Sequence, residues 1–287
     1  MKTNKFLLLC VVLLCTLSLS GQNKPIIVDL WPNGAPNSNG VKGEETFVAP
    51  GIPTNISKPN MTVYPSSKPN SKAIIMCPGG GYTAECATYE GNDMASWMNS
   101  IGVTFIVIKY RLPNNGHYEV PASDTHRAIV LAREHCKEWN IDPHAVGIMG
   151  ASAGGHLAAT ISNLYTKENR PDFQILLYPV ITMKTGKTHQ GSRETLLGKN
   201  PSSELVNKYS MELQVTEKTP RAFITLASDD SLVPPCNSLD YCSALIAHHV
   251  PVALFVYPTG EHGFGFHDSF VFKRQWTGEL EKWLSTF

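Results

Sequence analysis

The sequence predicts an α/β fold, with a mostly parallel central sheet and helices on both of its faces. From residue 72 onwards, short apolar and β-branched runs alternate with longer segments of helical character. Several apolar runs, such as residues 103–109, are continuous, as expected of strands that helices cover on both faces. One such run passes through Gly-x-Ser-x-Gly into an Ala- and Leu-rich segment, which gives the order strand, sharp turn, helix.

The elements can be assigned in chain order. Residues 21–71 are rich in Pro, Gly, Asn and Ser and contain two candidate strands, 26–30 and 61–64. Strands of the alternating part are expected at residues 73–77, 103–109, 145–149, 173–177, 222–227 and 252–257. Helices are expected at residues 92–100, 121–139, 153–165, 237–248 and 270–284. We expect these elements to form one domain over residues 21–287, which is long enough for a single large core.

A polar stretch at residues 182–219 interrupts this alternation. It is too long for a simple connection between strands, and it carries ten charged side chains. Ligands of parallel sheets bind beyond the carboxyl ends of the strands. We therefore expect a cap or long loop near that rim, and one too highly charged to cover a long apolar ligand.

The N-terminus has the organisation of a targeting signal. Lys2 and Lys5 precede an apolar segment at 6–17, and small residues at 18–20 suit a cleavage site. Twelve apolar residues are too few to span a membrane. We expect an exported protein, cleaved near residue 20, with no membrane span.

The composition excludes some partners and cofactors. The chain has 24 basic and 24 acidic residues, which gives no support to nucleic-acid binding. Five cysteines follow the targeting segment, an odd number, so at least one thiol is free, and none has metal-ligand spacing. The five are Cys77, Cys86, Cys136, Cys236 and Cys242. We expect mostly buried, reduced cysteines.

Ser152 is the candidate nucleophile. It stands at the centre of Gly150-Ala151-Ser152-Ala153-Gly154, between a predicted strand and a predicted helix. Glycines two residues on either side allow a tight turn and close packing of strand and helix, which leaves the hydroxyl exposed. The structural alternative is a Gly/Ser turn in which Ser152 caps the helix.

A serine hydroxyl needs a base, and the base needs an orienting carboxylate. His262 lies between glycines after the last predicted strand and is the favoured base, with His267 as the competitor. Asp230 follows the strand 222–227 in an Asp-x-x-Val-Pro arrangement and is the favoured carboxylate. Asp229 is its alternative, and either aspartate could instead close an Asx turn.

The run Pro78-Gly79-Gly80-Gly81-Tyr82 follows the strand 73–77. Its glycines let backbone amides approach a small anion, so the amides of Gly80 and Gly81, with that of Ala153, are the candidate oxyanion donors. A phosphate-binding loop is disfavoured because no Gly-Lys-Ser/Thr follows. We expect Tyr82 to face the pocket and contact substrate.

With these motifs, the chain resembles the α/β-hydrolase superfamily from residue 72 to its C-terminus. Residues 78–82, 150–156 and 230–234 together resemble exported bacterial carbohydrate esterases, the acetylxylan and acetyl esterases, and residues 30–36 are similar to the start of those proteins. Pro78 departs from the lipase pattern, in which a His often precedes the three glycines, and this puts long-acyl activity in doubt. In that branch, Asp124 and Arg127 correspond to an acidic and a basic residue, read here as an ion pair that pins the helix. Trp31 is the aromatic residue most suited to sugar stacking.

The resemblance implies a serine carboxylesterase that removes small acyl groups, above all acetyl, from plant cell-wall carbohydrates such as xylan, without metal or organic cofactor. Two alternatives remain. A prolyl-oligopeptidase-type peptidase would share the catalytic domain, but 287 residues leave no room for its propeller. A non-catalytic sugar-binding protein on a hydrolase fold is the other, and a broken triad geometry would favour it.

Overall fold

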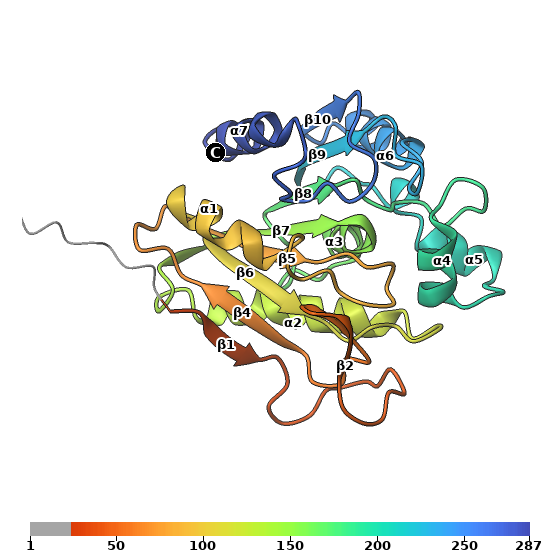
Figure 1. The fold of residues 1–287 in the computed structure, drawn as a ribbon, viewed down its shortest axis with the longest axis horizontal. Helices are drawn as coiled ribbons and strands as arrows, with labels where there is room; N and C mark the ends of the chain where they lie inside the picture. The colour runs from red at the N-terminus through yellow and green to blue at the C-terminus, as the bar shows by residue number, and fades with distance from the viewer. Residues whose placement is uncertain (1–23) are drawn as a thin grey trace, which may run out of the picture.

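The structure, a computed structural model, describes residues 24–287, so the targeting segment expected at residues 1–20 lies outside it. Its main sheet has eight strands in the spatial order β1-β4-β6-β5-β7-β8-β9-β10 (Figure 1). In that order the bounds are Ile26–Asp29, Asn60–Tyr64, Thr104–Lys109, Ser71–Cys77, Ile141–Ala151, Phe173–Leu177, Arg221–Ala227 and Val252–Tyr257. β4 runs antiparallel to β1 and β6, and the strands from β6 to β10 are parallel. The expectation of a mostly parallel sheet is confirmed.

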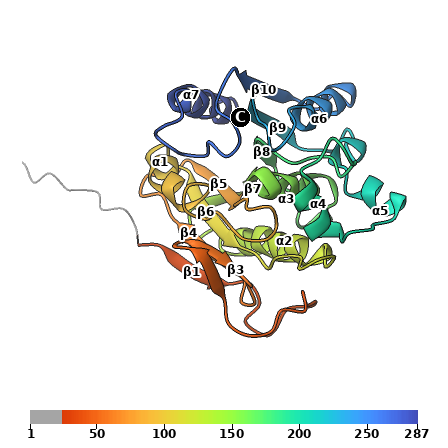
Figure 2. The ribbon, with the colours of Figure 1, turned by 45° about the vertical axis from the view of Figure 1, so that its right-hand side comes forward.

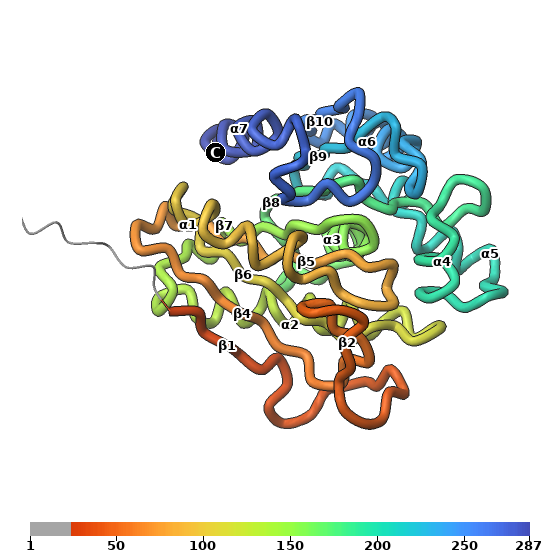
Figure 3. Tube along the Cα trace, in the orientation of Figure 1, coloured from red at the N-terminus to blue at the C-terminus, as the bar shows by residue number. Residues whose placement is uncertain are grey.

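Helices cover both faces of this sheet, and each face has its own apolar core. The 3-10 turn η1 (Asn92–Met94), α1 (Ala95–Ser100) and α7 (Lys273–Leu284) pack on one face, where Met98 and Trp276 are fully buried. The helices of the other face are α2 (Glu119–Glu134), α3 (Ser152–Asn163) and α6 (Cys236–Ala247). The tube in Figure 3 shows how the chain passes from the red edge of the sheet, at β1, to the blue edge, at β10.

The stretch expected as a cap or loop contains short helices. α4 (Gln190–Leu197), α5 (Ser203–Lys208) and the 3-10 turn η2 (Met211–Leu213) lie on the side toward which the parallel strands point (Figures 1 and 2). Met211 is fully buried in the core that α3 and α6 share, which anchors the stretch to the domain. The stretch thus lies at the carboxyl rim of the sheet.

The structure differs from the expected elements in several places, of which three concern whole elements or their ends in the core. A hairpin of β2 (Thr46–Ala49) and β3 (Ile52–Thr54) forms a separate two-stranded sheet within the N-terminal part. α2 ends at Glu134 rather than residue 139, because the following turn folds Trp139 back into the core against His135. α7 begins at Lys273, after the aromatic side chain of Phe270 has packed on Phe264 in the loop before it.

The ion pair expected between Asp124 and Arg127 is wrong. Asp124 points toward the sheet, is fully buried, and pairs with Arg111, whose guanidinium lies 2.6 Å from its carboxylate. The indole nitrogen of Trp31 donates to the same carboxylate at 2.7 Å. Arg127 lies three residues further along α2, faces outward, and pairs with Glu134 instead. A buried pair of this kind is destabilising to break, because the remaining charge is left without a partner.

Candidate active site

Ser152 lies at the turn between β7 and α3. Its φ is +54°, in the left-handed region that residues other than glycine rarely adopt. A Cβ on Gly150 would collide with the carbonyl oxygen of Gly154, and a Cβ on Gly154 with that of Cys77 in β5. Only glycine at positions 150 and 154 allows β7, α3 and the neighbouring strand β5 to pack this closely. The turn has the form of a nucleophile elbow.

Three polar side chains form one hydrogen-bonded chain at this turn. The hydroxyl oxygen of Ser152 lies 2.8 Å from Nε2 of His262, and Nδ1 of that ring lies 2.7 Å from Oδ2 of Asp230. The other carboxylate oxygen, Oδ1, accepts the amides of Leu232 and Val233 at 3.0 and 2.8 Å. Asp230 therefore closes an Asx-type turn and also contacts the histidine. Because the carboxylate of Asp230 accepts a hydrogen bond from Nδ1, the ring proton stays on Nδ1. Nε2 is then unprotonated and can accept the proton of the serine hydroxyl.

The two alternative residues lie nearby but outside this chain. Asp229 accepts the Thr259 hydroxyl at 2.7 Å and the amides of Gly260 and Glu261 at 3.2 and 2.8 Å. These hydrogen bonds, of which the one from Thr259 has the largest effect, hold the pKa of Asp229 below its usual value. Asp229 thus supports the loop that leads to the histidine. His267 stacks on Tyr89, with ring centroids 4.4 Å apart.

The glycine loop after β5 packs against the elbow. A Cβ on Gly79 would lie 2.9 Å from Cβ of Ser152, so no larger residue fits there. Gly80 and Gly81 have φ of +123° and +64°. Within residues 24–287, the amides of these two glycines and of Ala153 make no hydrogen bond. Three unpaired donors thus lie on the two segments that meet at the serine, an arrangement suited to a small oxyanion.

One buried carboxyl connects the glycine loop to the histidine loop. Oε2 of Glu90 accepts the amide of Gly79 at 2.9 Å, and Oε1 accepts the hydroxyl of Tyr178 at 2.8 Å. The ring of Tyr178 packs edge-on against His262, and its hydroxyl accepts the amide of Gly265 at 3.0 Å. Burial raises the pKa of Glu90, and the two hydrogen bonds partly oppose this shift. Neither Glu90 nor Tyr178 carries a local sequence signal, so only the folded structure reveals this connection.

Tyr82 does not face substrate, contrary to expectation. It has a φ of +61° and its side chain is 1% exposed, turned under the elbow helix. Its hydroxyl lies 2.9 Å from Nδ1 of His156, and Nε2 of His156 lies 2.8 Å from the carbonyl oxygen of Tyr209. With both partners inside the core, Tyr82 and His156 have a structural role.

The buried His156 makes stability depend on pH. Burial lowers its pKa from 6.5 to about 4, with the Tyr209 carbonyl opposing the shift. Between these two values the unfolded chain binds a proton that the folded protein does not, so stability falls as the pH falls. Protonation of this one group in the unfolded chain should lower the free energy of unfolding by about 3 kcal/mol between pH 6.5 and pH 4. We expect the thermal unfolding midpoint of His156→Gln to depend less steeply on pH than that of the wild type. The exposed His248, changed to Gln in parallel, controls for the loss of one histidine, and equal slopes for all three proteins would contradict the prediction.

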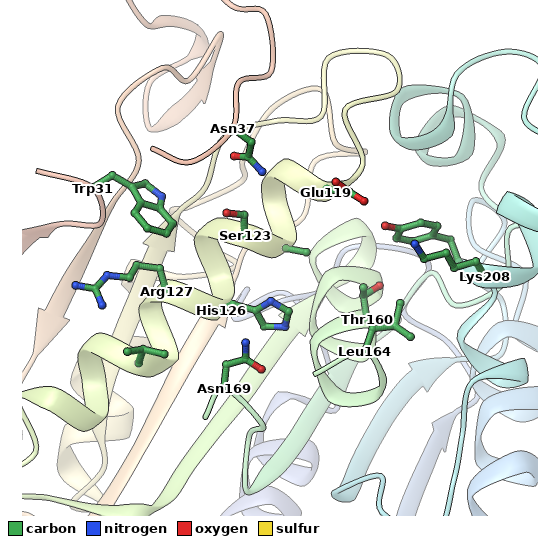
Figure 4. A pocket seen from close by; sticks show the side chains of 13 residues that line it. Trp31, Asn37, Glu119, Ser123, His126, Arg127, Thr160, Leu164, Asn169 and Lys208 are labelled. Carbon is green, nitrogen blue, oxygen red and sulfur yellow. The ribbon is translucent and has the colours of Figure 1, made fainter. Parts of the chain in front are cut away.

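A cavity of about 530 Å³ lies apart from the serine, between α2 and α3 and beside α5 (Figure 4). Its lining includes Trp31 and Arg127, together with Thr160 near the end of α3 and Leu164 directly after that helix. These last two follow Ser152 by eight and twelve residues, which places them about 12 and 18 Å along the helix axis. Trp31, the aromatic residue considered for sugar stacking, therefore belongs to this cavity and not to the catalytic rim.

The five cysteines of residues 24–287 form no disulfide, but only Cys77 and Cys242 are buried, so the expectation that most of them are buried is wrong. Over residues 24–287 no cluster of three or more His, Cys, Asp or Glu side chains is placed to hold a metal ion. No helix in this part of the chain is both long and apolar enough to cross a bilayer.

The chain is similar to known hydrolases and esterases. The profile of the alpha/beta hydrolase fold family matches residues 74–266. An acetylxylan esterase from Xylanibacter ruminicola is 40% identical over 233 residues, covering 80% of this chain and 48% of that protein. An endo-1,4-beta-xylanase B from Butyrivibrio fibrisolvens is 36% identical over 205 residues, 66% of this chain and 32% of that protein. The chain thus spans half or less of these curated relatives. The crystal structure of an acetyl ester-xyloside bifunctional hydrolase from Caldicellulosiruptor lactoaceticus superposes with a TM-score of 0.79 and 36% identity, over 91% of this chain and 96% of that one.

Proposed function

The chain belongs to the alpha/beta hydrolase fold family, and on this premise we propose that it is a serine esterase that removes acetyl groups from plant cell-wall carbohydrates such as xylan. The observation that carries the proposal is the chain of hydrogen bonds from Ser152 through His262 to Asp230, beside three unpaired amides. This arrangement joins a nucleophile, a base and oxyanion donors at one point. A non-catalytic sugar-binding role is disfavoured, because the triad geometry is unbroken.

Acylation begins at the hydroxyl of Ser152. His262 takes its proton on Nε2 while the oxygen attacks the ester carbonyl carbon. The carbonyl oxygen becomes an oxyanion, which the amides of Gly80, Gly81 and Ala153 stabilise. Asp230 stabilises the imidazolium. The bond between the carbonyl carbon and the sugar oxygen then breaks, and His262 gives its proton to that oxygen.

Deacylation repeats these steps with water. His262 removes a proton from a water molecule, which attacks the acetyl-serine carbonyl carbon. The same amides hold the second oxyanion. Collapse releases acetate and returns the proton to the serine oxygen. None of these steps requires a metal ion or an organic cofactor.

The similarity to an acetylxylan esterase and to an acetyl ester-xyloside hydrolase supports an acetylated carbohydrate as substrate. Such polymers lie outside the cell, which agrees with the targeting signal proposed at residues 1–20. The test is mass spectrometry of acetylated xylan, acetylated pectin and a peptide after incubation with the enzyme. Release of acetate from xylan is expected, whereas cleavage of the peptide alone would favour a peptidase.

The acyl pocket should be small. We expect kcat/KM for 4-nitrophenyl esters to fall steeply from acetate to octanoate, because surplus methylenes would clash in a closed pocket. Each methylene that a pocket does accommodate is worth only about 1–3 kcal/mol, so the steep loss must come from steric exclusion. Initial rates across the ester series measure it. Rates that rise with chain length, or a preference for methyl ferulate over acetylated sugar, would contradict acetyl specificity.

A further inference from the structure

His189 extends from the inserted stretch to the glycine loop. It is the residue immediately before α4, and a Cβ on Gly81 would lie 3.6 Å from Cε1 of its ring. His189 therefore lies against the glycine loop that carries two of the three candidate oxyanion donors. The inserted stretch thus contributes one imidazole to the edge of the active site. No local sequence pattern marks it.

The helix that His189 caps fixes which ring nitrogen carries the proton. Nδ1 accepts the backbone N–H of Ser192 at 3.3 Å and lies 2.8 Å from the hydroxyl oxygen of Ser192. A ring nitrogen that accepts a backbone N–H has no proton of its own, so the neutral ring carries its proton on Nε2. Nε2 makes no hydrogen bond to any residue in the described range 24–287. It is a donor without a protein partner.

The surroundings of the His189 ring favour its neutral form. Burial lowers the pKa of His189, and the nearby His262 lowers it further, while Asp230 acts in the opposite direction. A neutral ring suits an uncharged ligand. It would also leave the charge balance of the catalytic histidine undisturbed.

The substrate offers this donor few partners. In an acetyl ester the methyl group accepts no hydrogen bond, and the carbonyl oxygen is bound by the amides of Gly80, Gly81 and Ala153. The remaining acceptors of an acetylated sugar are the oxygens of the sugar itself. We infer that His189 is a substrate-binding residue whose Nε2–H donates to a sugar oxygen near the scissile ester, so that the enzyme prefers carbohydrate acetates over simple acetates. The inference rests on the proposed function for its substrate class.

Two substitutions separate this role from helix capping. In His189→Asn, the amide oxygen can still accept the N–H of Ser192, since Asn is a preferred capping residue, but the side chain is too short to place a donor at Nε2. In His189→Gln, the amide nitrogen reaches toward the position of Nε2, but the cap is weakened. Unfolding midpoints of both variants show that each is folded and how much the cap contributes.

The substrates are an acetylated xylobiose and cyclohexyl acetate. The alcohol part of cyclohexyl acetate is a six-membered carbon ring that carries no oxygen except that of the ester. For His189→Asn we expect kcat/KM to fall about five- to tenfold on acetylated xylobiose, the worth of one neutral hydrogen bond, and to stay unchanged on cyclohexyl acetate. His189→Gln should recover most of the loss. An equal change on both substrates would overturn the inference while the proposed function stands. A wild-type enzyme that hydrolyses cyclohexyl acetate but not acetylated xylobiose would overturn the proposed function, and the inference with it.

Discussion

Replacing Ser152 with alanine is expected to abolish ester hydrolysis and labelling by a fluorophosphonate probe. No other group occupies the position 2.8 Å from Nε2 of His262, so neither an acyl-enzyme nor a phosphonyl adduct can form. Triad residues act as a unit, and the loss in kcat should be at least about a thousandfold, approaching a millionfold. Initial rates on 4-nitrophenyl acetate and mass spectrometry of the labelled peptide measure both effects.

A matched control lies at the same rim. Ser231 also follows β9, but its hydroxyl bonds to the exposed carboxylate of Glu261 at 2.9 Å and is not in contact with a histidine. Ser231→Ala should keep both labelling and activity. Because alanine at 152 changes only one oxygen atom, its unfolding midpoint should remain close to that of the wild type. Labelling that persists in Ser152→Ala would refute the nucleophile.

Replacing Asp230 with asparagine should lower kcat by roughly ten-thousandfold. The carboxamide can keep the two backbone amides on its oxygen, but it then presents an NH₂ group to Nδ1 of His262. Nδ1 must become the acceptor, and the ring proton moves to Nε2. A protonated Nε2 cannot accept the proton of Ser152, so the fold survives while the base is lost.

Asp229→Asn is the neighbouring control for this prediction. Asp229 bonds to Thr259, Gly260 and Glu261 and not to the imidazole, so its loss should loosen the loop without changing the tautomer of His262. We expect a lower unfolding midpoint and an activity loss of at most about tenfold. Steady-state measurements of kcat for both variants under identical conditions test which aspartate orients His262. A larger loss in Asp229→Asn than in Asp230→Asn would reverse the assignment of the two aspartates.

The parts of the fold that local sequence determines were predicted well. β8 and β10 begin and end at the expected residues, because β10 is an uninterrupted apolar run and β8 is apolar except for the buried, hydrogen-bonded Gln174. The β2–β3 hairpin was missed because its exposed residues show neither a continuous apolar run nor a clear alternation. The end of α2 was placed too late because Trp139 looks like another apolar position of the helix. Its actual place in the core depends on a turn that only tertiary packing specifies.

In the candidate site, too, the residues with a local sequence signal were predicted and those placed by tertiary packing were not. Ser152, Asp230 and His262 each carry a local signal, a glycine-flanked turn or a position after a strand, and the structure places them together. Tyr82 was misplaced because its side-chain direction depends on a positive φ that the adjacent glycines do not reveal. Glu90 and His189 were not identified at all. Both act across distant segments, and a single sequence contains no record of such contacts.

The left-handed backbone of Ser152 has an evolutionary consequence. At this φ a glycine is unstrained, whereas any other L residue costs about 1–2 kcal/mol. Selection for stability and selection for hydrolysis therefore act in opposite directions on this one residue. A descendant no longer selected for hydrolysis would relieve this strain by a single change of serine to glycine. The strained backbone at the elbow is therefore maintained by selection for the reaction and not by selection for stability.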